Sequence, residues 1–281
     1  MDRLPKSGIH LPHTANNRVL TPFEYEALGL LWPGSVSLLD YQLTGDAQLE
    51  RWLRRRAQDG LQVYVRLYAA VKPDPAQHAA RLADIVRHYP YATGWLPANE
   101  PNIEWPGETA EGINQWCTDF WYNANYYRVT EGLRFRLYWP PIAQDAPLSH
   151  TALWNSCASS INLFLDSGGG IAWHDYYDPA QPLRMLEQEM PGWLHDRLPF
   201  VPTLIHECGR KPGIPADFLA LGPELINRYG NHNMPGSGHT VADAITPWLL
   251  SDSSGAFDGH AWQDQEGGFR QVCFDWRAFG P

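Results

Sequence analysis

Short apolar runs alternate with longer segments of helical periodicity along most of this chain. Most of the runs are continuously apolar, which is typical of parallel strands that are buried on both faces. They predict eight strands, at Ser7–His10, Val36–Tyr41, Gln62–Tyr68, Thr93–Ala98, Arg134–Trp139, Gly170–His174, Phe200–His206 and Ile245–Leu250. Their spacing is that of a strand followed by a helix, with a longer loop in some of the units.

The segments between these runs carry apolar residues at helical spacing. They predict helices at Asp46–Asp59, Pro75–His88, Glu111–Val129, His150–Leu165, Leu183–Leu198 and Pro215–Tyr229. Pro191 is expected to kink or split the fifth of these helices, because proline lacks a backbone donor. Strand–helix alternation of this kind favours a closed parallel barrel over an open sheet. We therefore predict an α/β fold, and within that class a (β/α)8 TIM barrel.

Length and composition agree with a single globular unit. The 281 residues are a usual length for one barrel, and 44% of them are hydrophobic. The chain contains no internal linker, low-complexity tract or close repeat, so residues 1–281 are predicted to form one domain. No cofactor is expected, because no Gly-rich nucleotide motif follows a predicted strand.

The charge balance limits the classes of partner. A net charge of -10 argues against nucleic acid and against an anionic membrane surface, which both attract basic patches. No stretch approaches the ~20 apolar residues of a membrane span. The N-terminus is not followed by an apolar signal core, so the protein is either cytoplasmic or secreted with its signal removed. The sequence decides neither this question nor the oligomeric state.

Two of the apolar runs end in a glutamate. Glu100 follows the fourth predicted strand in Asn-Glu-Pro-Asn, and Glu207 follows the seventh in His-Glu-Cys-Gly. A parallel barrel carries its chemistry at the carboxyl ends of its strands. Two carboxyl groups there are the minimum requirement for glycoside hydrolysis, since one protonates the leaving oxygen and the other attacks or activates water. An exposed turn is the simplest alternative for either segment alone.

Asn-Glu-Pro after a fourth strand, with a glutamate after a seventh, resembles the clan A retaining glycoside hydrolases. These are (β/α)8 enzymes that include cellulases, mannanases, xylosidases and glucuronidases. The resemblance implies that Glu100 is the acid/base, that Glu207 is the nucleophile and that Asn99 binds the sugar 2-hydroxyl. It also implies that the substrate is an oligosaccharide or polysaccharide with β-linkages, cleaved with retention of configuration.

The same families often place His-x-Tyr at strand 6 and a tryptophan at strand 8, positions that His174, Tyr176 and Trp248 occupy here. An arginine from an early strand usually supports the nucleophile. Arg66 is the candidate, although it lies on the third predicted strand where the family often uses the second. Trp139 ends the fifth predicted strand and is a candidate sugar platform, because an aromatic ring covers the apolar face of a sugar.

Elementary electrostatics makes these roles reasonable. Glu100 has to carry a proton to act as an acid. Burial, the aromatic side chains of Trp105 and Trp139 and the charge of Glu207 are all expected to raise its pKa. Glu207 has to be ionised, and Arg66 would favour that form.

Two alternatives stay open at this point. One is a carbohydrate-binding barrel without catalysis, which would keep the aromatic residues and show no turnover. The other is a metal-dependent barrel hydrolase, for which histidines at strand ends would serve as ligands. His10-x-x-His13 spans Pro12 and does not place two imidazoles on one face of a strand, so no metal is expected. His10 is interpreted as a residue that binds sugar or supports the site.

Overall fold

The structure is a computed structural model of the whole chain. It describes residues 6–11, 19–143, 150–177, 189–210 and 242–247, together with Pro223, Leu225 and Arg228. Trp248 and most of the predicted helix Pro215–Tyr229 lie outside the described residues.

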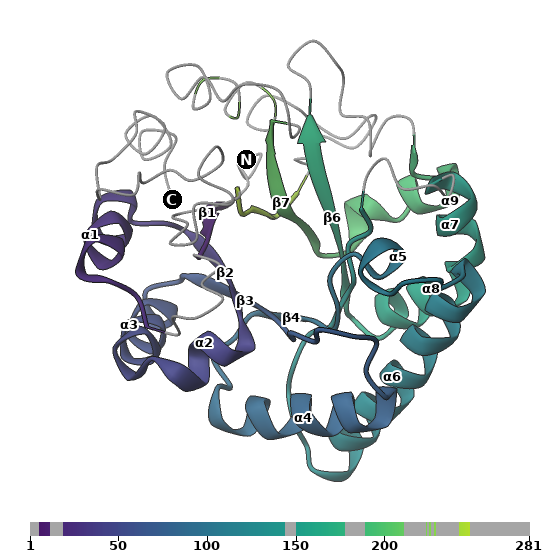
Figure 1. Ribbon diagram of the computed structural model, residues 1–281, viewed down its shortest axis with the longest axis horizontal. Helices are drawn as coiled ribbons and strands as arrows, with labels where there is room; N and C mark the ends of the chain where they lie inside the picture. Colours follow the sequence, from purple (N-terminus) through teal and green to yellow (C-terminus); the bar gives the residue numbers. More distant parts are fainter. Residues whose placement is uncertain are drawn as a thin grey trace.

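Within the described ranges, eight strands form one sheet in which every pairing is parallel, in the order β4-β3-β2-β1-β8-β7-β6-β5. The strands are β1 (Lys6–His10), β2 (Ser35–Leu39), β3 (Gln62–Arg66), β4 (Gly94–Leu96), β5 (Tyr138–Trp139), β6 (Gly170–Tyr177), β7 (Thr203–Arg210) and β8 (Ala244–Ile245). The sheet curls, so that its concave inner face points to the centre of the molecule (Figure 1). An isolated parallel bridge between Trp95 and Leu137 links the edge strand β4 to the residue that precedes β5, the other edge.

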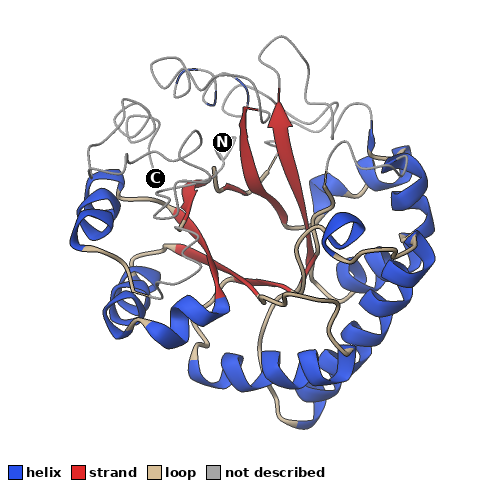
Figure 2. Cartoon of the chain, in the orientation of Figure 1, coloured by secondary structure: helices blue, strands red, loops and turns tan. Residues whose placement is uncertain are grey.

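Helices cover the outer face of this sheet (Figure 2). They are α1 (Pro22–Leu31), α2 (Asp40–Gly45), α3 (Ala47–Gln58), α4 (Pro75–His88), α5 (Pro101–Glu104), α6 (Ala110–Thr130), α7 (His150–Ser156), α8 (Ala158–Asp166) and α9 (Gly192–His195), with a 3-10 turn at Leu198–Phe200. The α/β class and the parallel pairing of the sheet are confirmed.

The predicted helix Pro75–His88 is confirmed at both ends, since Asp74 caps its first turn. The predicted helix His150–Leu165 breaks at Cys157 into α7 and α8. In the described part of the predicted helix Leu183–Leu198, Met190 and Pro191 are not helical, and α9 begins at Gly192. Helix α1 was not predicted, although Thr21 and Glu24 form a capping box at its start.

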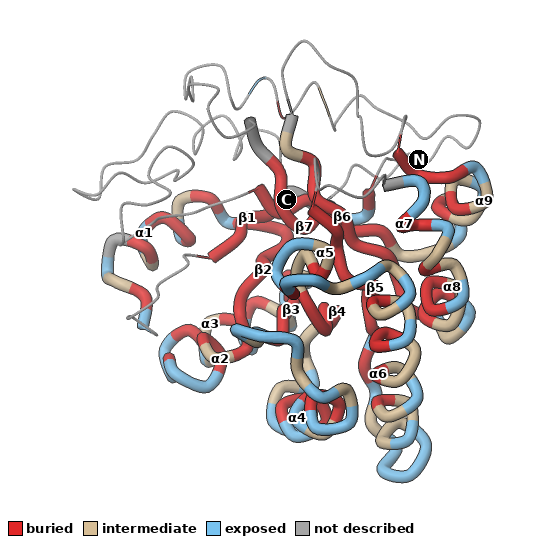
Figure 3. The backbone as a smooth tube through the Cα atoms, turned by 45° about the vertical axis from the view of Figure 1, so that its right-hand side comes forward, coloured by how far each residue is buried: buried red, intermediate tan, exposed pale blue. Residues whose placement is uncertain are grey.

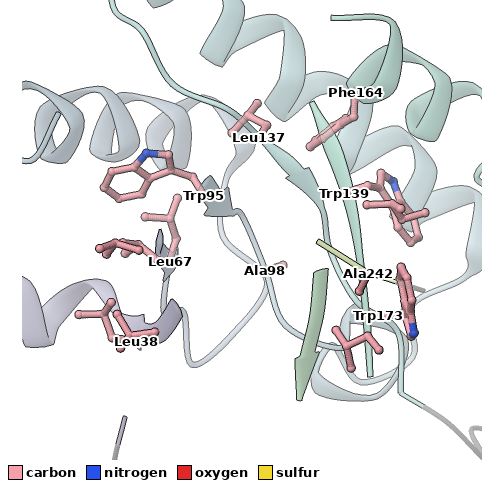
Figure 4. Close-up of a cluster of buried hydrophobic side chains, with 14 of the residues drawn as sticks. Leu38, Leu67, Trp95, Ala98, Leu137, Trp139, Phe164, Trp173 and Ala242 are labelled. Carbon is pink, nitrogen blue, oxygen red and sulfur yellow. The ribbon is translucent and has the colours of Figure 1, made fainter. Parts of the chain in front are cut away.

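The strands are buried on both faces (Figure 3). Side chains of the outer face pack against the helices and form the main core, which Figure 4 shows around Trp95, Trp139 and Trp173. The inner face carries a separate apolar cluster with one residue from each of six strands, namely Tyr64, Leu96, Tyr138, Ala172, Leu204 and Ala244. The side-chain period of a strand is two, so residues two positions further along also face inward. Arg66, His174 and His206 stand at those positions and begin a polar layer above the apolar one.

Candidate active site

Residues 97–99 follow β4, and Glu100 comes next as the N-terminal cap residue of α5. Its backbone has φ 25° and ψ 55°, which lies in the left-handed region that residues with a side chain rarely adopt. Pro101 disfavours a right-handed helical conformation at the preceding residue, so the local sequence contributes to this geometry. The Glu100 side chain is 16% exposed and bonds to His174, where Nδ1 lies 2.7 Å from Oε1.

Glu207 lies inside β7, opposite His174 of β6. The register between these strands shifts there: Trp173 pairs with Ile205, while His174 pairs with Glu207. His206 is therefore the additional residue of a β-bulge, which allows two consecutive side chains of one strand to reach the inner face. Both side chains reach the inner face here, because His206 contacts His174 and Glu207 contacts Arg66.

Both carboxyl groups lie beside the same imidazole nitrogen. His174 Nδ1 is 2.7 Å from Glu100 Oε1 and 3.7 Å from Glu207 Oε2. These two oxygens are therefore no farther apart than the sum of the two distances. Both carboxyl groups therefore lie close enough together to act on the same glycosidic bond.

Glu207 is held by two donors from different strands. Arg66 Nη1 donates to Oε1 at 2.9 Å, and the Tyr176 hydroxyl donates to Oε2 at 2.8 Å. The carboxylate is only 6% exposed, so its charge is compensated by the guanidinium and not by bulk water. Burial and the negative charge of Glu207 hold the pKa of Tyr176 well above its usual value, so the phenol keeps the proton that it donates.

The pKa shift of Glu100, which His174 largely determines, differs from the sequence-based expectation. Burial raises the pKa of Glu100, but the neighbouring His174 and Arg66 outweigh burial, and the net pKa is lowered. Burial lowers the pKa of His174, but the charges of Glu207 and Glu100 outweigh it, and the net pKa is raised. The predicted raised pKa of Glu100 is therefore wrong, and the directions of the two shifts favour the imidazole as the group that carries a proton.

Two further histidines, His206 and His10, lie next to His174 and Glu207, and both are fully buried. His206 Nδ1 lies 3.1 Å from His174 Nε2, and His206 Nε2 lies 2.7 Å from the Ser37 hydroxyl of β2. His10 of β1 uses Nδ1 for the carbonyl oxygen of Leu11, at 2.9 Å. Burial, the largest effect, lowers the pKa of His10 to about 3 and that of His206 well below its usual value.

Asn99 is fixed by a residue that the sequence did not single out. Its Nδ2 donates to Glu104 Oε1 at 2.6 Å, because α5 turns the exposed Glu104 back toward β4. A carboxylate only accepts, so this bond defines which way the amide points. Asn99 Oδ1 is buried and has no partner among the described residues. A cavity of about 80 Å³ adjoins Asn99 and Glu104 and reaches Arg66.

Trp139 does not belong to the site. It is fully buried in the core on the outer face of the sheet (Figure 4). Its indole N–H donates to the Ser160 hydroxyl at 3.1 Å, and its ring packs on Trp154. The predicted role as a sugar platform is wrong, because Trp139 follows an inward-facing Tyr138 and so points toward the helices. Trp105, predicted to raise the pKa of Glu100, is buried as well and packs on Trp116.

His10, His206 and Glu207 are the group within the described residues whose donor atoms lie close enough to hold a metal ion, all within 4.8 Å of one another. The contacts of these donors do not fit that use. Both ring nitrogens of His206 are hydrogen-bonded, and Glu207 Oε1 already accepts from a guanidinium. A cation there would have to displace Arg66.

No helix in the described ranges is long and apolar enough to cross a membrane.

No protein-family model and no curated protein sequence matches the chain. Solved structures do match. A β-glucuronidase from an uncultured Clostridium species has 12% sequence identity and a TM-score of 0.61, with 98% of this chain and 50% of that chain covered. An endo-β-1,3-glucanase of family GH128 from Sorangium cellulosum has 11% identity and a TM-score of 0.61, with 98% of both chains covered. A GH39 β-xylosidase from Caulobacter crescentus has 11% identity and a TM-score of 0.62, with 99% and 71% covered.

The chain thus spans half the length of the β-glucuronidase and nearly the whole of the glucanase. At such low identity the likeness concerns the fold. At that level the resemblance to clan A glycoside hydrolases predicted from the sequence is confirmed, and no individual family is singled out.

Proposed function

We propose that this protein is a glycoside hydrolase that cleaves a β-linked glycan with retention, with Glu207 as nucleophile and Glu100 as acid/base. Residues 1–281 would form one catalytic domain whose sheet closes into a (β/α)8 barrel. The observation that carries the proposal is the shared contact of both carboxyl groups with His174 Nδ1. This shared contact keeps the two carboxyl groups near each other, and retaining enzymes hold theirs about 5–5.5 Å apart.

In the first half-reaction Glu207 attacks the anomeric carbon while Glu100 protonates the departing glycosidic oxygen. Arg66 and Tyr176 orient the attacking carboxylate and stabilise its charge. In the second half-reaction Glu100 removes a proton from water, which attacks the glycosyl-enzyme and releases Glu207.

His174 makes the change of role at Glu100 feasible. The imidazolium donates to the Glu100 carboxylate in the free protein and can pass its Nδ1 proton to that oxygen when a leaving group needs it. The resulting neutral imidazole no longer lowers the pKa of Glu100, so the carboxylate becomes a stronger base for the second half-reaction.

The substrate is proposed to be an oligosaccharide or polysaccharide. Similar structures act on a β-glucuronide, a β-1,3-glucan and a β-xyloside according to their names, which supports a β-linkage here. Asn99 would bind the 2-hydroxyl through Oδ1, because Nδ2 is already occupied by Glu104.

A panel of aryl and alkyl glycosides and soluble polysaccharides tests the proposal, with the Glu207→Ala and Glu100→Ala variants measured in parallel. Glu207→Ala is expected to abolish turnover of every substrate, because no covalent intermediate can form. Glu100→Ala is expected to lower kcat/KM, which reports the first half-reaction, about 10²–10⁴-fold on alkyl glycosides and far less on aryl glycosides, whose leaving groups need no proton. Proton NMR of the first-formed product should show the β-anomer.

Glu131→Ala is the matched control, because Glu131 pairs with Arg87 at the surface and should leave all rates unchanged. Full activity of Glu207→Ala would disprove the nucleophile assignment. Binding of a glycan without hydrolysis, unchanged in Glu100→Gln, would identify a non-catalytic binding protein instead. Loss of activity on chelation, with a metal in the purified protein, would identify a metal-dependent hydrolase.

A further inference from the structure

Ser37, His206 and His174 form a continuous line of hydrogen bonds that ends at Glu100. The successive distances are 2.7 Å, 3.1 Å and 2.7 Å. Its members come from β2, β7, β6 and the segment between β4 and α5, in that order. The first three members are fully buried. We call it the Ser37–His206–His174 chain.

The chemistry of the four groups determines which nitrogen carries which proton. An ionised Glu100 only accepts, so His174 Nδ1 carries a proton. In the doubly protonated form of His174, Nε2 also carries one and donates to His206 Nδ1, which has to be bare. His206 then carries its single proton on Nε2 and donates it to the Ser37 hydroxyl.

The surroundings favour this arrangement. The charged and titratable groups near the two rings are Glu100 after β4, Glu207 on β7, Arg66 on β3, His10 on β1 and Tyr176 on β6. The two carboxylates lie against His174 and raise its pKa. Burial, together with His10, His174 and Arg66, lowers the pKa of His206, so His206 stays neutral and can accept.

We infer that His206, oriented by Ser37, is a positioning residue that binds the Nε2 proton of His174 and so reserves the Nδ1 proton for exchange with Glu100. The inference rests on the proposed function of Glu100. In the first half-reaction the Nδ1–H bond breaks, and the proton passes through Glu100 to the leaving oxygen. In the second, Glu100 takes a proton from water and Nδ1 takes it back, so His174 ends as it began.

A rise in pH reverses the direction of the hydrogen bond between His174 and His206. When His174 loses one proton to solvent, it keeps the Nδ1 proton that Glu100 binds, and its bare Nε2 accepts from His206. The neutral imidazole cannot give up that last proton without becoming an imidazolate, so kcat/KM falls as the pH rises through the upper apparent pKa of the Glu100–His174 pair. An acceptor for Nε2–H stabilises the charged form of His174, so loss of that acceptor moves this fall to lower pH.

The pH dependence of kcat/KM on an alkyl glycoside tests the chain in four variants. His206→Leu removes the acceptor and is expected to shift the basic limb down by about one pH unit, the effect of one charged hydrogen bond. Ser37→Ala should shift it in the same direction, because His206 loses the group that orients its proton. His206→Asn offers Oδ1 to the same proton and should restore the position of the limb. Ser35→Ala, the same change in a buried serine of the same strand, should not move it.

An unchanged basic limb in His206→Leu and Ser37→Ala would overturn the inference. Nitrogen-15 NMR of labelled histidines gives a second readout that needs no turnover. Below the pKa of His174, the Nδ1 signal of His206 should be that of a bare nitrogen and its Nε2 signal that of a protonated one. The midpoint of His174 should fall in His206→Leu.

A protonated Nδ1 on His206 under those conditions, or an unshifted His174 midpoint in the variant, would likewise overturn the inference. A protein that shows these signals but hydrolyses no glycoside would contradict the proposed function alone.

Discussion

At the scale of the residue, the contact between Asn99 and Glu104 determines which end of the Asn99 amide is available for the proposed contact with a sugar. Asn99 alone could offer either end of its amide to a hydroxyl group. Glu104 takes the Nδ2 end at 2.6 Å, and the buried Oδ1 has no partner among the described residues. A sugar hydroxyl would therefore donate to this side chain.

Glu104→Ala is expected to lower kcat/KM about ten-fold on glycosides with a 2-hydroxyl, because the amide becomes free to turn and one hydrogen bond is lost. The kcat/KM on the corresponding 2-deoxy glycoside should fall little, since that substrate never makes the hydrogen bond. Steady-state kinetics on the two substrates measures the difference. Glu104→Gln keeps an acceptor at Oε1 and serves as the control. Equal losses on both substrates would show that Glu104 acts elsewhere.

At the scale of the element, Asp46 joins two helices, α1 and α3, that contribute no residue to the candidate active site. Its Oδ1 accepts from the backbone N–H groups of Gln48 and Leu49 and so caps α3. Its Oδ2 accepts from the N–H of Leu20 and the hydroxyl of Tyr25, which anchors the start of α1. A single buried side chain thus satisfies donors from two separate parts of the chain.

Asp46→Ala is expected to lower the free energy of unfolding by about 3 kcal/mol, because a helix cap is worth about 1 kcal/mol and two further donors lose their acceptor. Thr109→Ala is the comparison, since the Thr109 side chain caps α6 through the N–H of Gly112 alone and should cost about 1 kcal/mol. Urea denaturation of both variants measures the two values. Equal losses would mean that the α1 contacts contribute nothing to stability.

At the scale of the whole molecule, the two edge strands of the sheet meet beside a glycine. Gly94 begins β4, and a Cβ at this position would lie 2.4 Å from the ring of Tyr138 in β5. Tyr138 belongs to the apolar cluster of the inner face and meets the Tyr64 ring edge-on. The bulk of Tyr138 therefore requires the absence of a side chain on the neighbouring strand.

Gly94→Ala is expected to lower the free energy of unfolding by about 2 kcal/mol, because the added methyl group forces Tyr138 out of its position. Gly29→Ala in α1 meets no atom within 4 Å and should raise stability by about 0.5–1 kcal/mol, since alanine is the better helix former. Thermal and chemical unfolding of the pair compares the two sites. A neutral Gly94→Ala variant would show that the β4–β5 junction tolerates a side chain.

Local patterns in the sequence were sufficient for several features. Apolar periodicity located helix α4 without error, and the cap that Asp74 provides is equally local, because helix ends depend on nearby side chains. The position of Glu100 after β4 follows from the end of an apolar run before Asn-Glu-Pro. These features depend only on residues that are close together along the chain, so a single sequence is enough to predict them.

Features that depend on neighbours across the sheet could not be predicted in this way. Trp139 faces the helices and Tyr138 the interior because the strand register sets the side, and a shift of one residue would exchange them. The bulge at His206 brings that residue and Glu207 to the inner face together. The lowered pKa of Glu100 follows from His174, a residue of another strand.

The sequence by itself therefore determined the α/β order and which residue types stand at the strand ends. Only the tertiary structure decided which side chains meet, because pairing between strands sums contacts between residues that lie far apart along the chain.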